Sequence, residues 1–453
     1  MDSPEDDTGG PETRGGTLIR RANGVLPRVA IISSNFWPEQ TGTSQTVSEL
    51  AEFLSRAGVR VEVATSMPYY PQWAIWAPYR ARLWFTEKKD DVTIHRSWHY
   101  VSPQPSTLTR LLHEVSLSLL SLPNLWHVLR RATDAYVVIP ALGYAFTAMV
   151  LARILGVRTV LVVKDIMPDA AVELGMLRSK AAIAMSRWIA RKLYGWADEI
   201  HTLGEGMRRR IAKRVERPDK IHIVPDTIDG AELAPVPLAD NEFRKRFAPD
   251  SKFAVLHTGN MGQKQDLSLL LRVARRLRSD PGIHFYVFGD GAVKDEFLRQ
   301  RKEWGLDNVS HFPLQERWML RHMLSGADVV LVSQLPEVVD IVVPSKLITA
   351  LGAGAMVVAA CAPLSETARL MRESRGGVWT PASDDLELAR ALQRIRGGEI
   401  DVQACRRNGR EFAVRTFDRT AVYGPLSKGH LAHSRRPDAV RAPAGSYASR
   451  SVT

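Results

Sequence analysis

Short apolar runs alternate with amphipathic stretches along most of the chain, a pattern that predicts strands and helices in succession. Arg28–Ser34 reads as a first buried strand, Ser44–Ala57 as a helix and Val59–Thr65 as the next strand. Four more strands are predicted in the first half of the chain, at residues 94–98, 136–139, 159–163 and 199–202. This rhythm is typical of an α/β fold whose doubly wound parallel sheet carries helices on both faces.

The rhythm restarts in the second half of the chain, which predicts a second α/β domain. Its strands are expected at residues 253–258, 283–288, 309–312, 329–332, 356–360 and 377–379. We predict an N-terminal domain over 27–228, a C-terminal domain over 229–405, and a helix over 406–427 that packs back toward the N-terminal domain. Segments 1–26 and 428–453 are expected to be disordered tails, and the first is not expected to be a signal peptide.

One uncharged run is long enough to be tested as a membrane span. Ala135–Ala152 contains no charged residue over 18 positions. Pro140 and Gly143 interrupt it, and the pattern favours a strand at Ala135–Ile139 followed by a helix at Tyr144–Leu155. We therefore expect a strand and a helix of a parallel sheet rather than a span.

The composition is that of a soluble globular protein, with 453 residues of which 45% are hydrophobic and 24% charged. Cys361 and Cys405 are too few for a disulfide framework, which fits a reducing cytosol, and neither has neighbours that would complete a zinc site. A net charge of +12 favours an anionic partner, such as a phosphorylated substrate or an acidic membrane surface. Nucleic acid is not expected, because no basic motif with interleaved aromatic residues occurs.

A glycine-rich loop between a predicted strand and a predicted helix carries the first candidate chemistry. Gly259 and Gly262 allow a tight turn after the strand at 253–258, and Asp266 can cap the helix that follows. Backbone N–H groups and the positive end of that helix would lie beside Lys264, an arrangement that suits a phosphate. An ordinary strand–helix turn with a solvated lysine is the alternative.

Two further helix starts are candidate anion sites. Gly42 and Thr43 come just before a predicted helix, and in two tandem α/β domains they would lie across a cleft from the Lys264 loop. Pro344 favours a first helical turn, where Ser345 and Lys346 offer hydroxyl and ammonium donors for a diphosphate. Simple capped helices are the alternative in both places.

Seven short segments of the chain occur in a characteristic order. They are Pro38–Gly42, Pro68–Trp73, Gln104–His113, Lys164–Asp169, Gly259–Lys264, Phe288–Gly291 and Pro344–Leu347. On these segments the chain, over about residues 27–427, resembles the retaining glycosyltransferases of family 4 with the GT-B fold. More narrowly, it resembles the bacterial transferases of the colanic acid and O-antigen type. The resemblance implies two Rossmann-like domains facing across a cleft, and a hexosyltransferase-type enzyme of exopolysaccharide synthesis.

The resemblance also implies substrates and roles. Lys264 would neutralise the diphosphate of a nucleotide sugar, and the groups around it would be Gly42, Thr43, Gly259, Asn260, Pro344, Ser345 and Lys346. Stabilising the leaving diphosphate is then the main catalytic task, for which the family needs no metal or other cofactor. The acceptor would be a saccharide, normally linked through a diphosphate to a lipid. We therefore expect a cytoplasmic chain that is peripheral on the inner face of the membrane, where its anionic surface is a partner.

Further candidates follow from the same resemblance. Asp340 could supply a carboxylate to the donor sugar, although a surface loop residue is the alternative. Asp165 could orient or deprotonate the acceptor hydroxyl, although a helix cap is nearly as good a reading. Glu39 and His113 are assigned to the acceptor side, with core packing as the alternative for His113.

The chain also departs from the family pattern. Asn260 stands where many members carry arginine, and Ile341 and Thr349 stand where many carry a pair of glutamates. The absent glutamates motivate a second hypothesis, a catalytically silent GT-B protein that binds sugar nucleotides. A third hypothesis is a nucleotide-sugar 2-epimerase of similar fold, which would consume the donor without an acceptor.

Overall fold

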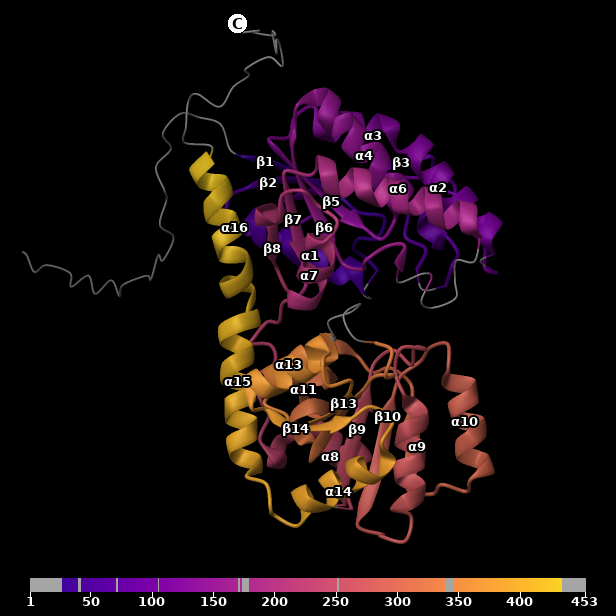
Figure 1. Cartoon of the computed structure of the whole chain (residues 1–453), viewed down its shortest axis with the longest axis vertical. Coiled ribbons are helices and arrows are strands. Elements are labelled where there is room, and N and C mark those ends of the chain that lie inside the picture. The colour runs from indigo at the N-terminus through magenta and orange to yellow at the C-terminus, as the bar shows by residue number, and fades with distance from the viewer. Residues whose placement is uncertain are drawn as a thin grey trace, which may run out of the picture.

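Two lobes, joined along one side by a pair of long helices, make up the computed structural model of the chain (Figure 1). It describes residues 27–39, 42–70, 72–104, 106–169, 172, 179–250, 252–338 and 345–433. The joining helices are α15 (Val402–Phe417) and α16 (Arg419–His433). Each lobe contains one sheet whose strands mostly alternate with helices along the chain, so the expected pair of α/β domains is confirmed.

The N-terminal lobe is built on an eight-stranded sheet of order β3-β4-β2-β1-β5-β6-β7-β8. Its strands are β1 (Arg28–Ile32), β2 (Arg60–Ser66), β3 (Trp84–Lys89), β4 (Val92–Ser97), β5 (Asp134–Ile139), β6 (Arg158–Val163), β7 (Glu199–Thr202) and β8 (Ile221–Ile223). Its helices are α1 (Thr43–Arg56), α2 (Thr107–Leu120), α3 (Leu122–Leu129), α4 (Leu142–Leu155), α6 (Lys180–Trp196) and α7 (Glu205–Ala212). All pairings are parallel except that of β3, an edge strand that pairs antiparallel with β4 and that the sequence pattern did not predict.

The C-terminal lobe carries a six-stranded, fully parallel sheet of order β11-β10-β9-β12-β13-β14. Its strands are β9 (Phe253–Thr258), β10 (Ile283–Phe288), β11 (Val309–Phe312), β12 (Val329–Ser333), β13 (Val357–Cys361) and β14 (Gly377–Pro381). Its helices are α8 (Glu242–Phe247), α9 (Leu267–Arg276), α10 (Lys294–Glu303), α11 (Arg317–Gly326), α12 (Ser345–Gly352), α13 (Glu366–Ser374) and α14 (Asp385–Arg396).

The central strands of the N-terminal lobe are buried on both faces. Successive side chains of β1 point to opposite sides of the sheet, so Ile31 packs in the core with α1 while Ile32 packs in the core with α3 and α4. The uncharged run at 135–152 forms β5 and α4 of this core, as the sequence predicted. Among the described residues, no helix has the length and apolar character that crossing a bilayer requires.

The chain crosses between the lobes twice, and the two crossings lie side by side. Ile228 N–H donates to Phe417 O at 2.8 Å, and Arg419 N–H donates to Ile228 O at 3.0 Å. Asp418 separates α15 from α16 and is extended there. Arg419 then reaches Glu49 of α1 at 2.7 Å, so α16 packs on the N-terminal lobe.

α16 continues past the predicted boundary at residue 427, because its last turns have partners in the N-terminal lobe. His430 Nδ1 lies 3.3 Å from Asp134 Oδ2, and the other ring nitrogen lies 2.9 Å from the Tyr136 hydroxyl. Tyr423 packs edge-on against Phe53 of α1 at a ring distance of 5.6 Å. The predicted tail at 434–453 and the segment at 1–26 lie outside the described residues.

Candidate active site

The loop after β9 is shaped by close backbone contacts. Gly259 has a φ of 106°, which a side chain would strain, and its N–H donates to Phe288 O at 2.8 Å. Asp266 caps α9 by accepting the N–H of Leu269 at 2.9 Å. The strand and helix predicted on either side of the loop are therefore present, and Lys264 lies between them.

The loop that follows β10, at Gly289–Gly291, packs against the loop that follows β9. A side chain at Gly289 would place its Cβ 2.2 Å from Gly259 O, which no side chain could tolerate. Met261 N–H donates to Asp290 O at 2.8 Å, and a side chain at Gly262 would place its Cβ 2.9 Å from Asn260 Nδ2. The two loops are thus held against each other at the carboxyl ends of the adjacent strands β9 and β10.

Lys264 reaches across to the other lobe. Its Nζ lies 3.6 Å from Oδ1 of Asp165, which follows β6 in the N-terminal lobe. About a third of each side chain is exposed, 28% and 32%, so a ligand can reach both. The neighbouring Lys164 is bound to Asp226 at 2.7 Å and does not compete for Asp165. The structure therefore brings together two residues that the sequence places 99 positions apart.

Lys346, in contrast, is tucked under the Lys264 loop. Its ammonium donates to Asn260 O at 2.9 Å and to Gln265 Oε1 at 2.7 Å, and lies 3.3 Å from Nε2 of His257. Burial lowers the pKa of Lys346 to about 7, and burial followed by Lys346 holds the pKa of His257 well below its usual range. Lys346 therefore fixes the loop rather than standing free in front of it.

The two further helix starts that the sequence proposes as anion sites are present, at α1 and α12. Gly42 is exposed with a φ of 57° at the start of α1, where the N-cap residue makes no side-chain hydrogen bond to the helix. The loop from β1 to α1 emerges at the same edge of the sheet as Asp165, because β1, β5 and β6 are parallel neighbours. Ser345 is exposed at the start of α12. The predicted site residues Asp340 and Pro344 lie outside the described residues.

Glu39, which the resemblance assigns to the acceptor side, is hydrogen-bonded to backbone N–H groups and to one side chain. Its Oε1 accepts the N–H groups of Tyr69 and Tyr70 at 2.8 and 2.7 Å, and its Oε2 accepts from Asn35 at 2.9 Å. Only 3% of the residue is exposed, and burial raises the pKa of its carboxyl. Glu39 holds the turn at 68–70 in place.

His113 belongs to an aromatic group, as the packing alternative anticipated. Its ring lies 5.0 Å from Tyr69, 4.8 Å from His99 and 5.9 Å from Trp73, centre to centre. Its Nδ1 lies 3.0 Å from Tyr100 O, and burial lowers its pKa. Only 7% of His113 is exposed, so its side chain packs inside the N-terminal lobe.

Glu114 is a buried carboxyl that the sequence argument missed. It accepts the N–H groups of Gly143 and Tyr144, at 2.9 and 3.4 Å, and so occupies the start of α4. Burial raises the pKa of this carboxyl to about 7 despite those two bonds. Spacing gives no signal for it, because Gly143 lies 29 residues away and no capping motif spans that distance.

We expect Glu114→Gln to make the free energy of unfolding less dependent on pH. The folded wild type keeps a proton on Glu114 that the unfolded chain releases above pH 4.5, so stability falls as the pH rises from about 4.5 to about 7. Glutamine can still accept the N–H of Gly143 but cannot ionise. Urea unfolding at pH 5 and pH 8 should show a wild-type loss that exceeds the variant's by about 2–3 kcal/mol. Equal losses would mean that Glu114 is ionised in the folded protein.

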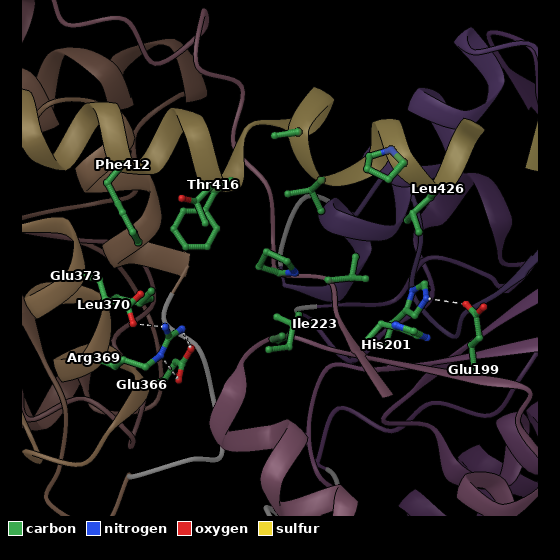
Figure 2. A pocket seen from close by; sticks show the side chains of 18 residues that line it. Glu199, His201, Ile223, Glu366, Arg369, Leu370, Glu373, Phe412, Thr416 and Leu426 are labelled. Carbon is green, nitrogen blue, oxygen red and sulfur yellow. Dashed lines mark hydrogen bonds and ion pairs between the residues drawn. The ribbon is translucent and has the colours of Figure 1, made fainter. Parts of the chain in front are cut away.

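A cavity of about 590 Å³ lies beside α15 and α16 and is lined by other residues than the candidate site residues described above. Figure 2 shows Glu366, Arg369 and Glu373 on one wall, His201 and Glu199 on the other, and Phe412, Thr416 and Leu426 from α15 and α16. The acidic side chains of α13 are already paired with Arg369. None of the predicted site residues that the structure describes lines this cavity, so it is not the candidate site.

Comparisons with known proteins agree on both lobes. A model of the "glycosyl transferase 4-like domain" matches residues 41–227, and a model of "glycosyl transferases group 1" matches residues 252–396. The putative colanic acid biosynthesis glycosyl transferase WcaI of Escherichia coli K12 is 31% identical over 406 residues, which cover 87% of this chain and 97% of that protein. The probable glycosyltransferase WbjE of Pseudomonas aeruginosa is 26% identical over 245 residues, 53% and 60% of the two chains.

Solved structures share the fold at low identity. HepE of Anabaena in complex with UDP aligns with a TM-score of 0.68 and 14% identity over 90% of this chain and 100% of that one. The complex of the same protein with UDP-glucose gives 0.66 and 15%, over 89% and 99%. WaaG, a glycosyltransferase involved in lipopolysaccharide biosynthesis, gives 0.63 and 14% over 88% and 98%.

Proposed function

The chain belongs to the group 1 glycosyltransferases, family 4 of the GT-B fold, and we propose that it transfers a sugar with retention of anomeric configuration. The donor would be a nucleoside diphosphate sugar, which the UDP and UDP-glucose complexes of a structural neighbour support. The acceptor would be a saccharide linked through a diphosphate to a lipid, in the synthesis of an exopolysaccharide or O-antigen. Similarity to WcaI over 97% of that protein supports this setting.

The contact between Lys264 and Asp165 is the observation that carries the proposal. It joins a cation at a glycine loop of one lobe to a carboxylate at a strand end of the other, within 3.6 Å. In the free protein Asp165 neutralises Lys264. A donor diphosphate would take over Lys264, because its charge is larger than that of one carboxylate, and would release Asp165 toward the acceptor hydroxyl.

We propose that the protein itself supplies the positive field for the leaving diphosphate. Lys264 provides a full charge, and the N-termini of α1 and α12, at Gly42, Thr43 and Ser345, provide backbone N–H groups. Negative charge develops on the departing diphosphate, so donors fixed in advance lower the barrier without a metal ion. Lys346 acts indirectly, since it holds Asn260 and Gln265 in the loop that carries Lys264.

A donor and acceptor panel tests this function. The full chain would be incubated with several nucleoside diphosphate sugars, with and without short lipid-diphosphate saccharides, and nucleoside diphosphate release measured. We expect release from one donor only when an acceptor is present, and an anomeric coupling in the product that matches the donor's. Donor consumption without an acceptor would instead indicate an epimerase, and donor binding without any turnover a catalytically silent protein.

An exposed apolar stripe on the N-terminal lobe supports contact with a membrane. Every third or fourth residue of α2 and the start of α3 is apolar and exposed, and the stripe consists of Leu108, Leu111, Leu112, Val115, Leu119 and Leu122. Trp84 of β3 extends it, because its indole N–H donates to Leu120 O at 2.7 Å. Arg82 lies 4.3 Å above the nearby Phe85 ring. Apolar and basic groups side by side suit an anionic bilayer surface, where we place the inner-membrane acceptor.

The stripe predicts a membrane phenotype for Leu111→Ser/Leu119→Ser. These leucines are 59% and 60% exposed, so the folded protein loses little packing when they are replaced. The membrane-bound protein loses two apolar side chains that would insert into the bilayer. We expect binding to vesicles containing anionic lipid, measured by co-sedimentation at low salt, to weaken by about tenfold or more. Leu314→Ser/Leu364→Ser removes two leucines of the C-terminal lobe that are 53% and 79% exposed, and this variant should bind as wild type does. Equal sedimentation of all three proteins would exclude the stripe as the contact.

A further inference from the structure

Three side chains from separate elements of the N-terminal lobe bring atoms that can bind a metal ion close to one another. Glu62 comes from β2, His95 from β4 and His127 from α3. One ligand atom of each lies within 4.8 Å of those of the other two. Glu62 and His95 are each 7% exposed, whereas His127 is half-buried and open to solvent on one side. Two of the three residues are therefore buried, and an ion can reach the group from the side of His127.

The parallel register of the sheet explains why these residues meet. Ala64 of β2 is paired with His95 of β4, so Glu62, two residues before Ala64, projects from the same face as His95. α3 packs across that face with Leu125, Val128 and Leu129 in the core, which brings His127 over the sheet. No short sequence motif announces the group, because its members stand 33 and 32 residues apart.

The His95 ring lies between the Thr86 hydroxyl and the Glu62 carboxylate. Its Nδ1 lies 3.2 Å from the Thr86 hydroxyl, and its Nε2 lies 3.5 Å from Glu62 Oε2, beyond the geometry of a hydrogen bond. When Nδ1 carries the proton, the lone pair of Nε2 faces the Glu62 carboxylate, and a cation bound between the two atoms would stabilise that arrangement.

Two arginines on the surface of the lobe lie beside the group formed by Glu62, His95 and His127. Arg60 Nε lies 3.5 Å from Glu62 Oε1, and Arg131 Nη1 lies 3.2 Å from His127 Nε2. The side chain of Arg60 is 50% exposed and Arg131 is exposed, so both can turn into solvent when another cation takes their place.

We propose that Glu62, His95 and His127 form a binding site for a divalent transition metal, with zinc as the best match. Two imidazoles and one carboxylate are a known ligand set for zinc, and a water would complete the tetrahedron. Zinc–nitrogen bonds of 2.0–2.1 Å place ligand atoms about 3.3 Å apart, so the group must contract from its present spacing. His127 can do so because it is half-buried on the rim of the site.

The site would tie the edge of the sheet to its covering helix. It links β2, β4 and α3, and Thr86 of β3 orients His95 from the fourth element. None of the residues proposed for sugar transfer belongs to it, so it stands independently of the proposed function. Metal binding here stabilises the folded chain by mass action and does not supply a catalytic metal.

Zinc titration of the full chain tests the site. Chelator-treated protein would be titrated with zinc chloride, with bound metal counted by elemental analysis and thermal unfolding followed in parallel. We expect about one equivalent of zinc per chain and a raised unfolding temperature. His127→Ala should weaken zinc binding more than about 100-fold, because loss of a ligand exceeds the 10–100-fold cost of losing an outer contact. Thr86→Val, which removes such a contact, should weaken it by about 10–100-fold.

His222→Ala is the matched control, since His222 is exposed at β8 and lies outside the group. It should bind zinc as wild type does. Glu62→Gln should behave like His127→Ala and keeps the shape of the side chain. Equal zinc binding by wild type, His127→Ala and Glu62→Gln would overturn the proposal, as would binding that His222→Ala alone removes. His127→Ala is expected to fold, because alanine favours a helix and His127 is only half-buried.

Discussion

Replacing Lys264 with alanine is expected to lower kcat for sugar transfer by about 100- to 1,000-fold, the usual cost of one preorganised donor at a developing negative charge. It should also weaken donor binding, because the diphosphate loses its nearest full charge. We expect Lys264 to stabilise more of this charge than its counterpart does in family members that carry arginine where Asn260 stands. Steady-state kinetics with a fixed acceptor would give both values.

Two controls make the Lys264 result specific. Lys302→Ala removes an exposed lysine of α10 and should leave kcat unchanged. Lys264→Arg keeps the charge with different geometry and should recover part of the activity. If Lys264→Ala turned over at the wild-type rate, the leaving-group charge would have to be stabilised elsewhere, and the donor site would need to be assigned to other residues.

Asp165→Asn should separate catalysis from donor binding. We expect kcat to fall by about 100-fold or more, because the variant cannot accept the proton of the acceptor hydroxyl. Donor affinity should stay the same or increase, since Lys264 loses its counter-ion in the free protein and gains more from a diphosphate. Titration calorimetry with the nucleoside diphosphate and initial rates with the acceptor would measure the two effects.

The two variants, Lys264→Ala and Asp165→Asn, are distinguished by their effects on donor affinity. Lys264→Ala weakens donor binding, whereas Asp165→Asn does not. Asp307→Asn, at an exposed aspartate of the C-terminal lobe, should change neither quantity. Loss of donor affinity in Asp165→Asn would mean that this carboxylate positions the donor rather than the acceptor.

Much of the fold follows from local patterns in the sequence. Apolar runs such as Phe253–Thr258 are strands, and the interrupted run at 135–152 is β5 and α4 rather than a span. Edge strand β3 escaped prediction because its burial alternates between exposed and half-buried, so Trp84–Lys89 reads like a polar loop. Local pattern was sufficient where a strand is buried on both faces and failed at the edge.

The site was less predictable, because long-range contacts decide which groups are free. Lys346 and Glu39 are polar residues beside the proposed donor loops, yet one is held by Gln265 and the other by the backbone of Tyr69 and Tyr70. Nothing in the spacing of the chain announces those partners. The pairing of Lys264 with Asp165 needs both lobes in place, so sequence could nominate each residue but not their contact.

The packing of α16 has a consequence for how the protein is made. The N-terminal lobe is translated first, yet its last helix follows about 190 residues after Ile228. At a synthesis rate of 5–20 residues per second, that lobe waits about 10–40 s on the ribosome with Phe53 and Tyr136 lacking their partners on α16. The first lobe to emerge is therefore the last to be completed, because the surface around Phe53 and Tyr136 is covered only after α16 has been synthesised.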